Sequence, residues 1–100
     1  MRIISGKFKS TKLFIPLGKE TRPLKDIVKE SIFNTLLHFK KFPFKFKNAK
    51  ILDLYSGTGS FGLECLSRDA SKVTFVENNK NALKILQKNI INLILKKRPP

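Results

Sequence analysis

Residues 51–68 read ILDLYSGTGSFGLECLSR, and this stretch decides the fold. It predicts a short buried strand over residues 51–54, a glycine-rich turn, and a helix from Ser60 onward. Glycines allow the backbone of the turn to take positive φ and to approach a ligand closely. The helix then directs its unpaired N–H groups at that ligand. A strand, turn and helix of this kind form nucleotide and cofactor pockets in open α/β sheets.

A second strand and a second helix are predicted after this unit. In residues 71–77 the apolar residues, Val73, Phe75 and Val76, follow one another closely enough for a parallel strand that is covered on both faces. Asn78 or Asn79 can cap the helix that follows, whose apolar residues recur at helical spacing as far as Ile94. We therefore predict an α/β fold, an incomplete Rossmann-like core of two parallel strands and their helices over residues 49–100.

The residues before this core, 1–48, are predicted to form a basic extension. Residues 1–20 indicate a β-hairpin or small meander with its turn near Ser10 and Thr11. Three lysines would lie on its solvated face. They either contact phosphate or decorate an edge strand that resists aggregation.

A helix is predicted within the extension, over about residues 25–39. Pro23 suits its first turn, and an apolar stripe indicates that one face belongs to the core. The stripe consists of Val28, Ile32, Phe33, Leu36 and Leu37. Residues 39–48 then alternate aromatics with lysines, and we interpret them as a connector whose phenylalanines fix the helix to the sheet. The alternative is a surface on which single-stranded nucleic acid stacks.

The charge of the chain indicates a polyanionic partner. Its 100 residues carry 21 Lys and Arg against seven Asp and Glu, a net charge of +14. Residues 1–50 hold 13 of the bases and three of the acids, so the charge is concentrated away from the glycine-rich turn. Nucleic acid is the partner that this pattern favours. The alternative is compositional bias, since 17 of the bases are Lys.

Several classes of protein are excluded by composition. The chain has no run of 18 apolar residues and no apolar core of a signal peptide, so we expect a cytoplasmic protein without a membrane span. Cys65 is the only cysteine and His38 the only histidine, so we expect neither disulfides nor a metal site. One hundred residues allow one small domain at most.

The acids around the turn identify the kind of ligand. Gly57, Gly59 and Gly62 form a G-x-G-x-x-G pattern with Glu77 twenty residues after the first glycine, which alone would indicate a dinucleotide. Asp53, at the end of the strand, would repel a pyrophosphate but attract an ammonium or a sulfonium, as in S-adenosylmethionine. Glu77 can accept hydrogen bonds from ribose hydroxyls. The alternatives are a turn-capping role for Asp53 and a helix N-terminal acid at Glu77.

Residues 53–68 resemble the cofactor motif of the RsmD-type methyltransferases, which modify the exocyclic amine of a guanine in bacterial small-subunit rRNA. Residues 2–9 (RIISGKFK) resemble the opening of that family, and residues 21–34 (TRPLKDIVKESIFN) resemble its second signature. Residues 73–77 (VTFVE) resemble the strand whose acid holds the ribose, and Asn89 falls where the next helix usually has an Asn. Several signatures that follow one another in the order of the family identify it more specifically than any one signature does.

The resemblance implies methylation of guanine N2 in 16S rRNA with S-adenosyl-L-methionine, with this chain supplying the cofactor pocket. The basic N-terminal residues would meet the rRNA or its ribosomal particle. The expected cofactor-binding residues are Arg22, Asp53, Tyr55, Gly57, Gly59, Glu77 and Asn78. The expected RNA-binding residues are Arg2, Lys7, Lys9 and Lys12.

The sequence departs from the family pattern at several points. Leu24 and Ile27 replace polar or basic residues, Cys65 replaces a small apolar residue, and Asp69 stands where a helix-ending Gly is usual. The acceptor motif of the family, Asp or Asn followed by Pro-Pro and an aromatic, does not occur in the 100 residues. That motif orients the target amine and stacks on the base. We therefore expect the N-terminal part of such an enzyme, without catalysis of its own and with a C-terminal half as its partner.

Two other functions stay open. The first is a non-catalytic basic RNA-binding module that keeps a vestigial turn. The second is a fragment of an NAD-dependent oxidoreductase, which Asp53 and the basic N-terminal half disfavour.

Overall fold

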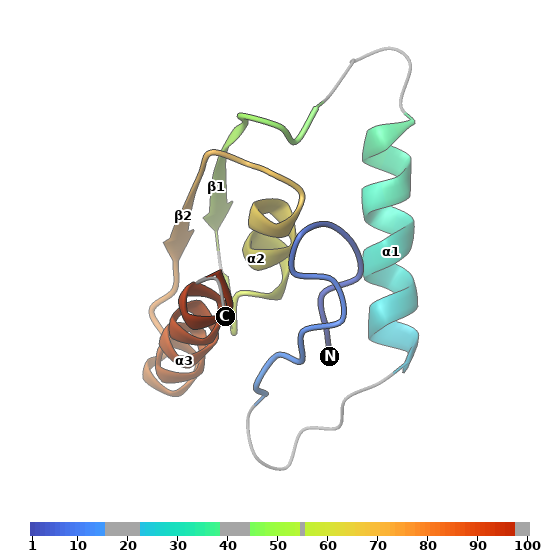
Figure 1. Ribbon diagram of the computed structural model, residues 1–100. Coiled ribbons are helices and arrows are strands. Elements are labelled where there is room, and N and C mark those ends of the chain that lie inside the picture. Colours follow the sequence, from blue (N-terminus) through green and yellow to red (C-terminus); the bar gives the residue numbers. More distant parts are fainter. Residues whose placement is uncertain (16–22, 39–44, 55, 98–100) are drawn as a thin grey trace.

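The computed structural model describes residues 1–15, 23–38, 45–54 and 56–97. The described chain forms three helices and two strands in the order α1, β1, α2, β2, α3 (Figure 1). Their bounds are α1 Pro23–Leu37, β1 Lys50–Leu54, α2 Ser60–Ser67, β2 Lys72–Val76 and α3 Lys80–Lys97. The predicted α/β class and the parallel core are thus confirmed.

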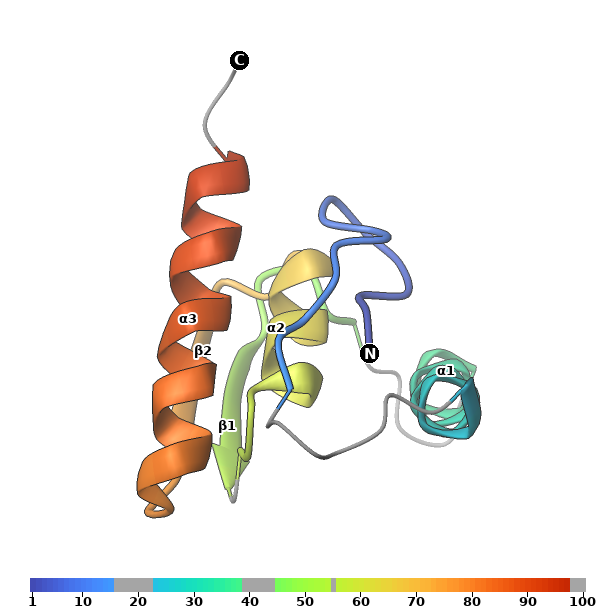
Figure 2. The ribbon, with the colours of Figure 1, turned by 90° about the horizontal axis from the view of Figure 1, so that it is seen from below.

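The two strands pair in parallel, with Ile51 opposite Val73 and Asp53 opposite Phe75. A parallel pair needs a crossover, and α2 provides it. Both ribbon views place α2 between the sheet and α1, with the N-terminal segment beside α2 (Figures 1 and 2). Because the strand residues alternate in direction, one face of the sheet packs on α2 and the other faces away.

Two clusters of buried side chains hold the layers together. In one, Ile3 and Leu13 of the N-terminal segment meet Leu63 of α2 and Leu93 of α3. The other is built around Phe33 of α1. It contains Phe33, Phe46, Cys65 and Ala70. Each cluster combines residues from both sides of the predicted boundary at residue 48, and the division into two units there stays a prediction.

The prediction of paired strands in an N-terminal hairpin is wrong. The described residues there form a single antiparallel bridge, between Arg2 and Lys12, around a compact loop. Gly6 and Ser10 both take positive φ, 88° and 72°, which curves the chain too strongly for paired strands. Several N–H groups of the loop also bond to side chains of α2 instead of to a partner strand.

The apolar stripe of α1 is only partly in the core. Phe33 is fully buried and stacks on Phe61 with ring centroids 4.9 Å apart, but Val28, Ile32 and Leu37 are 44–49% exposed. The prediction that the whole stripe is core is therefore wrong, because, of the five residues, Phe33 and Leu36 are the ones that pack in this cluster. The helix begins at Pro23, as its fixed φ favours.

The connector prediction is confirmed where the structure describes it. Phe46 is buried, with its ring 5.2 Å from that of Phe33. Residues 39–44 lie outside the described residues.

The predicted covering of the sheet on both faces is wrong for the described chain. Leu52, Leu54 and Val76 are 47–62% exposed on the face away from α2. Asn79, by contrast, caps α3 as predicted, since its Oδ1 accepts the N–H of Ala82 at 3.0 Å. In the described part of the chain, no helix is long and apolar enough to cross a membrane.

Two departures from the family pattern fit the fold. Cys65 is fully buried, and burial raises the pKa of its thiol to about 12, which keeps the thiol neutral. Asp69 takes a φ of 76° after α2, the left-handed geometry for which a glycine is usual.

Candidate cofactor site

Asp53 lies at the carboxyl end of β1 and faces the start of α2. Its Oδ2 accepts the N–H of Gly62 at 3.1 Å. Gly59, the residue at the N-cap of α2, has no side chain, so Asp53 supplies from the strand the cap that the helix lacks. The capping interpretation is thus confirmed for Oδ2, while Oδ1 accepts no hydrogen bond from the described residues. Burial raises the pKa of Asp53, and the Gly62 N–H opposes that shift.

The three glycines of the motif serve different purposes. Gly57 has a φ of 58°, and a Cβ there would meet nothing within 4 Å, so its outer side is open. Gly59 has a φ of 91°, and a Cβ there would overlap Leu86 of α3. A Cβ at Gly62 would overlap Phe75 of β2. Gly57 therefore leaves room for a ligand, whereas the other two allow close packing of helix on helix and helix on strand.

Glu77 follows β2 directly and reaches back to the turn. Its Oε1 accepts the N–H of Gly57 at 2.7 Å, and its Oε2 accepts the N–H of Asn79 at 2.9 Å. These backbone donors, with Asn79 the stronger, lower the pKa of Glu77, which is anionic at neutral pH. The two carboxylate oxygens together have about four acceptor positions, so these hydrogen bonds leave room on Glu77 for a ligand.

Ser56 joins the ends of the two strands, a role that sequence reasoning missed. Its Oγ donates to the carbonyl of Asp53 at 2.6 Å and accepts the N–H of Val76 at 3.0 Å. Its own N–H donates to the carbonyl of Val76 at 2.9 Å. The available signal was a hydroxyl residue immediately before the first glycine.

Asn89 of α3 fixes the far side of the turn and is fully buried. Its Nδ2 donates to the carbonyl of Thr58 at 2.8 Å and to that of Phe14 at 3.2 Å. Its Oδ1 accepts the N–H of Phe14 at 2.7 Å. A lone amide among the apolar positions of the helix was the signal for this role.

The structure brings four of the predicted cofactor residues together: Asp53, Gly57, Gly59 and Glu77. Asn78 is exposed next to Glu77, and its backbone N–H adds to the lowering of the Glu77 pKa. Arg22 and Tyr55 lie outside the described residues.

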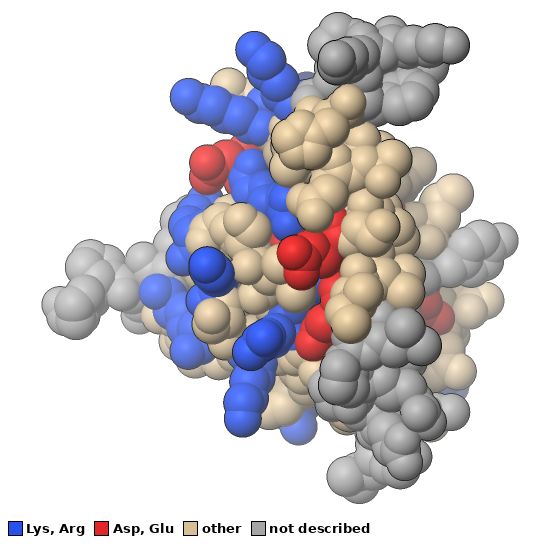
Figure 3. Space-filling model, turned by 90° about the vertical axis from the view of Figure 1, so that its right-hand side faces the viewer, with Lys and Arg blue, Asp and Glu red and all other residues tan. Residues whose placement is uncertain are grey.

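The predicted RNA-binding residues lie on the N-terminal loop and its bridge. Arg2, Lys7, Lys9 and Lys12 are all exposed. Lys7 is 3.8 Å from Asp69 and lies over the ring of Phe8. Figure 3 shows Lys and Arg side chains projecting from one side of the molecule, with a few acidic groups among them.

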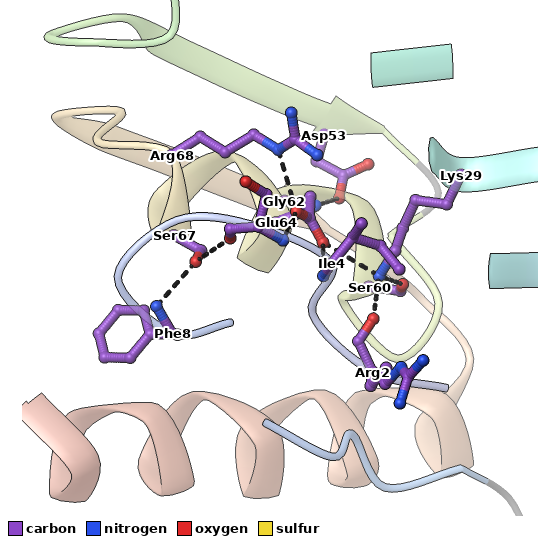
Figure 4. A network of polar contacts seen from close by, with 11 residues as sticks. Arg2, Ile4, Phe8, Lys29, Asp53, Ser60, Gly62, Glu64, Ser67 and Arg68 are labelled. Atoms are coloured by element: carbon purple, nitrogen blue, oxygen red, sulfur yellow. Dashed lines mark hydrogen bonds and ion pairs between the residues drawn. The ribbon is translucent and has the colours of Figure 1, made fainter. Parts of the chain in front are cut away.

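A buried polar network holds this loop on α2 (Figure 4). Glu64, fully buried, accepts the N–H groups of Ile4 and Ser5 at 2.8 and 3.0 Å. Ser67 accepts the N–H of Phe8 at 2.9 Å and donates to the carbonyl of Ser5 at 2.6 Å. Sequence reasoning missed both residues, although a glutamate between the apolar Leu63 and Cys65 was a signal of a buried role.

The chain is similar to a family of known proteins over nearly its whole length. Residues 1–98 match the family described as conserved hypothetical protein 95. The ribosomal RNA small subunit methyltransferase D of Haemophilus influenzae is 39% identical over 93 residues, which cover 93% of this chain and 45% of that protein. The protein of the same name from Escherichia coli K12 is 36% identical over 93 residues, which cover 93% of this chain and 44% of that protein.

Solved methyltransferase structures share the fold. One from Escherichia coli has a TM-score of 0.75 and 36% identity, covering 94% of this chain and 48% of that one. A methylase from Haemophilus influenzae has a TM-score of 0.61 and 38% identity, covering 92% of this chain and 44% of that one. The chain thus spans about half the length of the curated relatives that it matches.

Proposed function

Because the chain belongs to the RsmD-type family of methyltransferases, we propose that it supplies the S-adenosyl-L-methionine pocket of an enzyme that methylates the N2 of a guanine in small-subunit rRNA. The site residues, the cofactor and the RNA-facing segment are parts of this proposal. A cytoplasmic location is proposed with it, since rRNA is the partner.

The observation that carries the proposal is the pair of carboxylates at the ends of adjacent parallel strands. Asp53 and Glu77 flank an open turn at Gly57, and each keeps acceptor positions that no described residue occupies. Such a pair of anionic acceptors fits a cofactor with a cationic end and ribose hydroxyls. It does not fit a pyrophosphate, since Asp53 already takes an N–H at the helix N-terminus where a phosphate would bind.

Each residue of the site has a different proposed role in binding. Asp53 attracts the cationic end of the cofactor, and Glu77 accepts hydrogen bonds from the ribose. Gly57 keeps the approach to the turn free of a side chain. When bound, S-adenosyl-L-methionine supplies a methyl group that its sulfonium activates toward an amine nitrogen. We assign no residue of these 100 to the acceptor amine, because the acceptor motif is not among them.

The N-terminal loop is proposed to meet the RNA. Its exposed Arg2, Lys7, Lys9 and Lys12 offer positive charge to phosphates, and phosphate contacts position a protein on nucleic acid. The loop is anchored on α2, the helix that starts at the cofactor turn. The same helix therefore supports both proposed binding regions.

Calorimetry with S-adenosyl-L-methionine tests the cofactor assignment. We expect weak but measurable binding by the 100-residue chain and no binding of NAD. Glu77→Gln should weaken binding about tenfold, because an amide nitrogen replaces one acceptor oxygen. Glu30→Gln, at an exposed position of α1, is the matched control and should bind like the original chain. Equal affinity of both variants would contradict the assignment of Glu77.

The two alternatives give different results in the same experiments. An RNA-binding module would bind rRNA in a salt-dependent way and would not bind S-adenosyl-L-methionine. A nicotinamide-dependent fragment would show affinity for NAD. Methyl transfer to small-subunit particles by the purified 100-residue chain would show that the acceptor groups lie within it, contrary to our proposal.

A further inference from the structure

Lys29 is a buried lysine on α1, with 7% of its side chain exposed. Its Nζ lies 3.3 Å from Oε1 of the fully buried Glu64. Burial lowers the pKa of Lys29, and the nearby Glu64 opposes that shift. A buried ammonium is expensive to desolvate, so its contacts define what the residue does.

The contacts of Lys29 join the two regions to which function is proposed. Its Nζ donates to the carbonyl of Arg2 at 2.7 Å and to the Oγ of Ser60 at 3.0 Å (Figure 4). Arg2 belongs to the N-terminal segment that is proposed to face the RNA, and it pairs with Lys12 through the antiparallel bridge. Ser60 is the first residue of α2 and follows Gly59 of the cofactor turn. One ammonium group therefore bonds both regions.

Glu64 holds the same stretch of N-terminal backbone through a second set of bonds. It accepts the N–H groups of Ile4 and Ser5, and its Oε2 also accepts from Nε of Arg68 at 2.9 Å. The backbone from Arg2 to Ser5 is thus fixed from two sides, by Lys29 through a carbonyl and by Glu64 through N–H groups. This arrangement fixes the position of the segment along α2 and also the distance between the segment and that helix.

Stability alone does not account for a lysine here. A well-packed apolar side chain commonly replaces a buried ion pair without loss of stability. An apolar residue would not bond to two fixed oxygens, one in each region. What Lys29 adds is register between the segment and the turn, and buried polar groups are best attested in roles of that kind.

We propose that Lys29 is a positioning residue that holds the RNA-facing segment in register with the cofactor turn. The inference rests on the proposed function, because it takes Arg2 and Lys12 as RNA contacts. Through the bridge, Lys29 keeps both basic residues at a fixed place relative to the methyl donor. Small displacements of a bound substrate from the reacting group are costly, so such register matters for methyl transfer.

A double-mutant cycle with isolated 16S rRNA and the full 100-residue chain tests the inference. Lys12→Ala alone should weaken RNA binding about fivefold, the loss of one phosphate contact. In a Lys29→Met background, Lys12→Ala should weaken RNA binding by less than about twofold, because Lys12 is then already out of register. Lys84→Met, which removes an exposed lysine of α3, is the matched control and should leave the fivefold cost intact. Lys29→Arg, which keeps charge and donors, should restore part of it.

The outcomes separate this inference from the function beneath it. Additive costs of Lys12→Ala and Lys29→Met, in variants that remain folded, would overturn the register role and leave the proposed function standing. Failure of the original chain to bind rRNA would overturn both. Failure to bind S-adenosyl-L-methionine would overturn the cofactor pocket alone. If Lys29→Met does not fold, Ser60→Ala takes its place in the cycle, since it removes the bond from Lys29 to the first residue of α2 and keeps the ion pair of Lys29 with Glu64.

Discussion

The cofactor turn, whose described residues 56–59 lie between β1 and α2, and the N-terminal segment, residues 1–15, are both irregular, and acids hold both in place. They differ in how far those acids are satisfied. Each oxygen of Glu64, which holds the segment, has two partners: Ile4 N–H and Lys29 on Oε1, Ser5 N–H and Arg68 on Oε2. Glu77, which holds the turn, accepts one hydrogen bond on each oxygen, from Gly57 and Asn79, and the N–H of Asn78 adds a weaker interaction.

This difference separates a structural carboxylate from one that can still bind. A carboxylate offers about four acceptor positions, so Glu64 is saturated and Glu77 is not. Glu64 is also fully buried, whereas Glu77 is partly exposed. Two glutamates in one small chain therefore have opposite roles, one in holding a loop and the other in meeting a ligand.

The largest effect is expected from removing the saturated acid. Glu64→Ala leaves Lys29 and Arg68 buried without their anion and two N–H groups without an acceptor, so unfolding free energy should fall by about 3–5 kcal/mol. Urea unfolding followed by circular dichroism measures the loss. Glu77→Ala should cost clearly less, and Glu30→Ala, exposed on α1, serves as the baseline. Equal losses for Glu64→Ala and Glu77→Ala would show that the two glutamates do not differ in role.

The next effect comes from the glycine of each region. Gly6→Ala combines a φ of 88° with a Cβ that would overlap the carbonyl oxygen of Ser67, so it should cost about 3 kcal/mol. Gly57→Ala meets only backbone strain at φ 58° with open space around it, so about 1 kcal/mol is expected. Thermal unfolding of the two variants gives the comparison directly. A larger loss for Gly57→Ala would mean that the turn, and not the segment, is the tightly packed region.

The same difference explains what the sequence can predict. The turn is encoded within about ten residues: strand β1, Gly57, Gly59 and the start of α2 were all predictable from local pattern, and Asp53 from its place at the strand end. The segment is not encoded locally. Its hairpin pattern was outweighed by Glu64, which lies some sixty residues further along the chain and bonds the N–H groups that strands would have used. No local periodicity reveals such a pairing.

Asn89 links the two regions and should give an intermediate effect. Asn89→Ala leaves the N–H and carbonyl of Phe14 and the carbonyl of Thr58 without their partner, so a loss of about 2 kcal/mol is expected. Hydrogen exchange should increase at Phe14 and around Thr58 together, because one side chain holds both. Asn81→Ala, on an exposed position of the same helix, is the control. Faster exchange at only one of the two sites would show that Asn89 does not join them.

The smallest expected effect is the pH dependence of stability that comes from the two acids of the turn. The dependence has opposite signs for the two acids. Backbone donors, Asn79 first and then Gly57, lower the pKa of Glu77 below its ordinary 4.5, whereas burial raises the pKa of Asp53 above its ordinary 3.8. Glu77 therefore contributes stability that is present above pH 4.5 and is lost as the pH falls through its folded pKa. The contribution of Asp53 is present below pH 3.8 and is lost as the pH rises through its raised pKa, since folding then removes water from a charged group.

Carbon-detected NMR titration of both carboxyl groups, with urea unfolding across the same pH range, measures this contrast. Asp53→Asn keeps an oxygen for the Gly62 N–H but removes the buried charge, so it should unfold at a urea concentration equal to or higher than that of the original chain at neutral pH. Glu77→Gln should reduce the loss of stability on acidification, because the carboxylate that must be protonated is gone. An Asp53 midpoint below 3.8 or a Glu77 midpoint above 4.5 would contradict the assignment of burial to one acid and of backbone donors to the other. The pH dependence thus tests at single carboxyl groups whether the acids of the turn are held, as proposed, by a few bonds that leave room for a ligand.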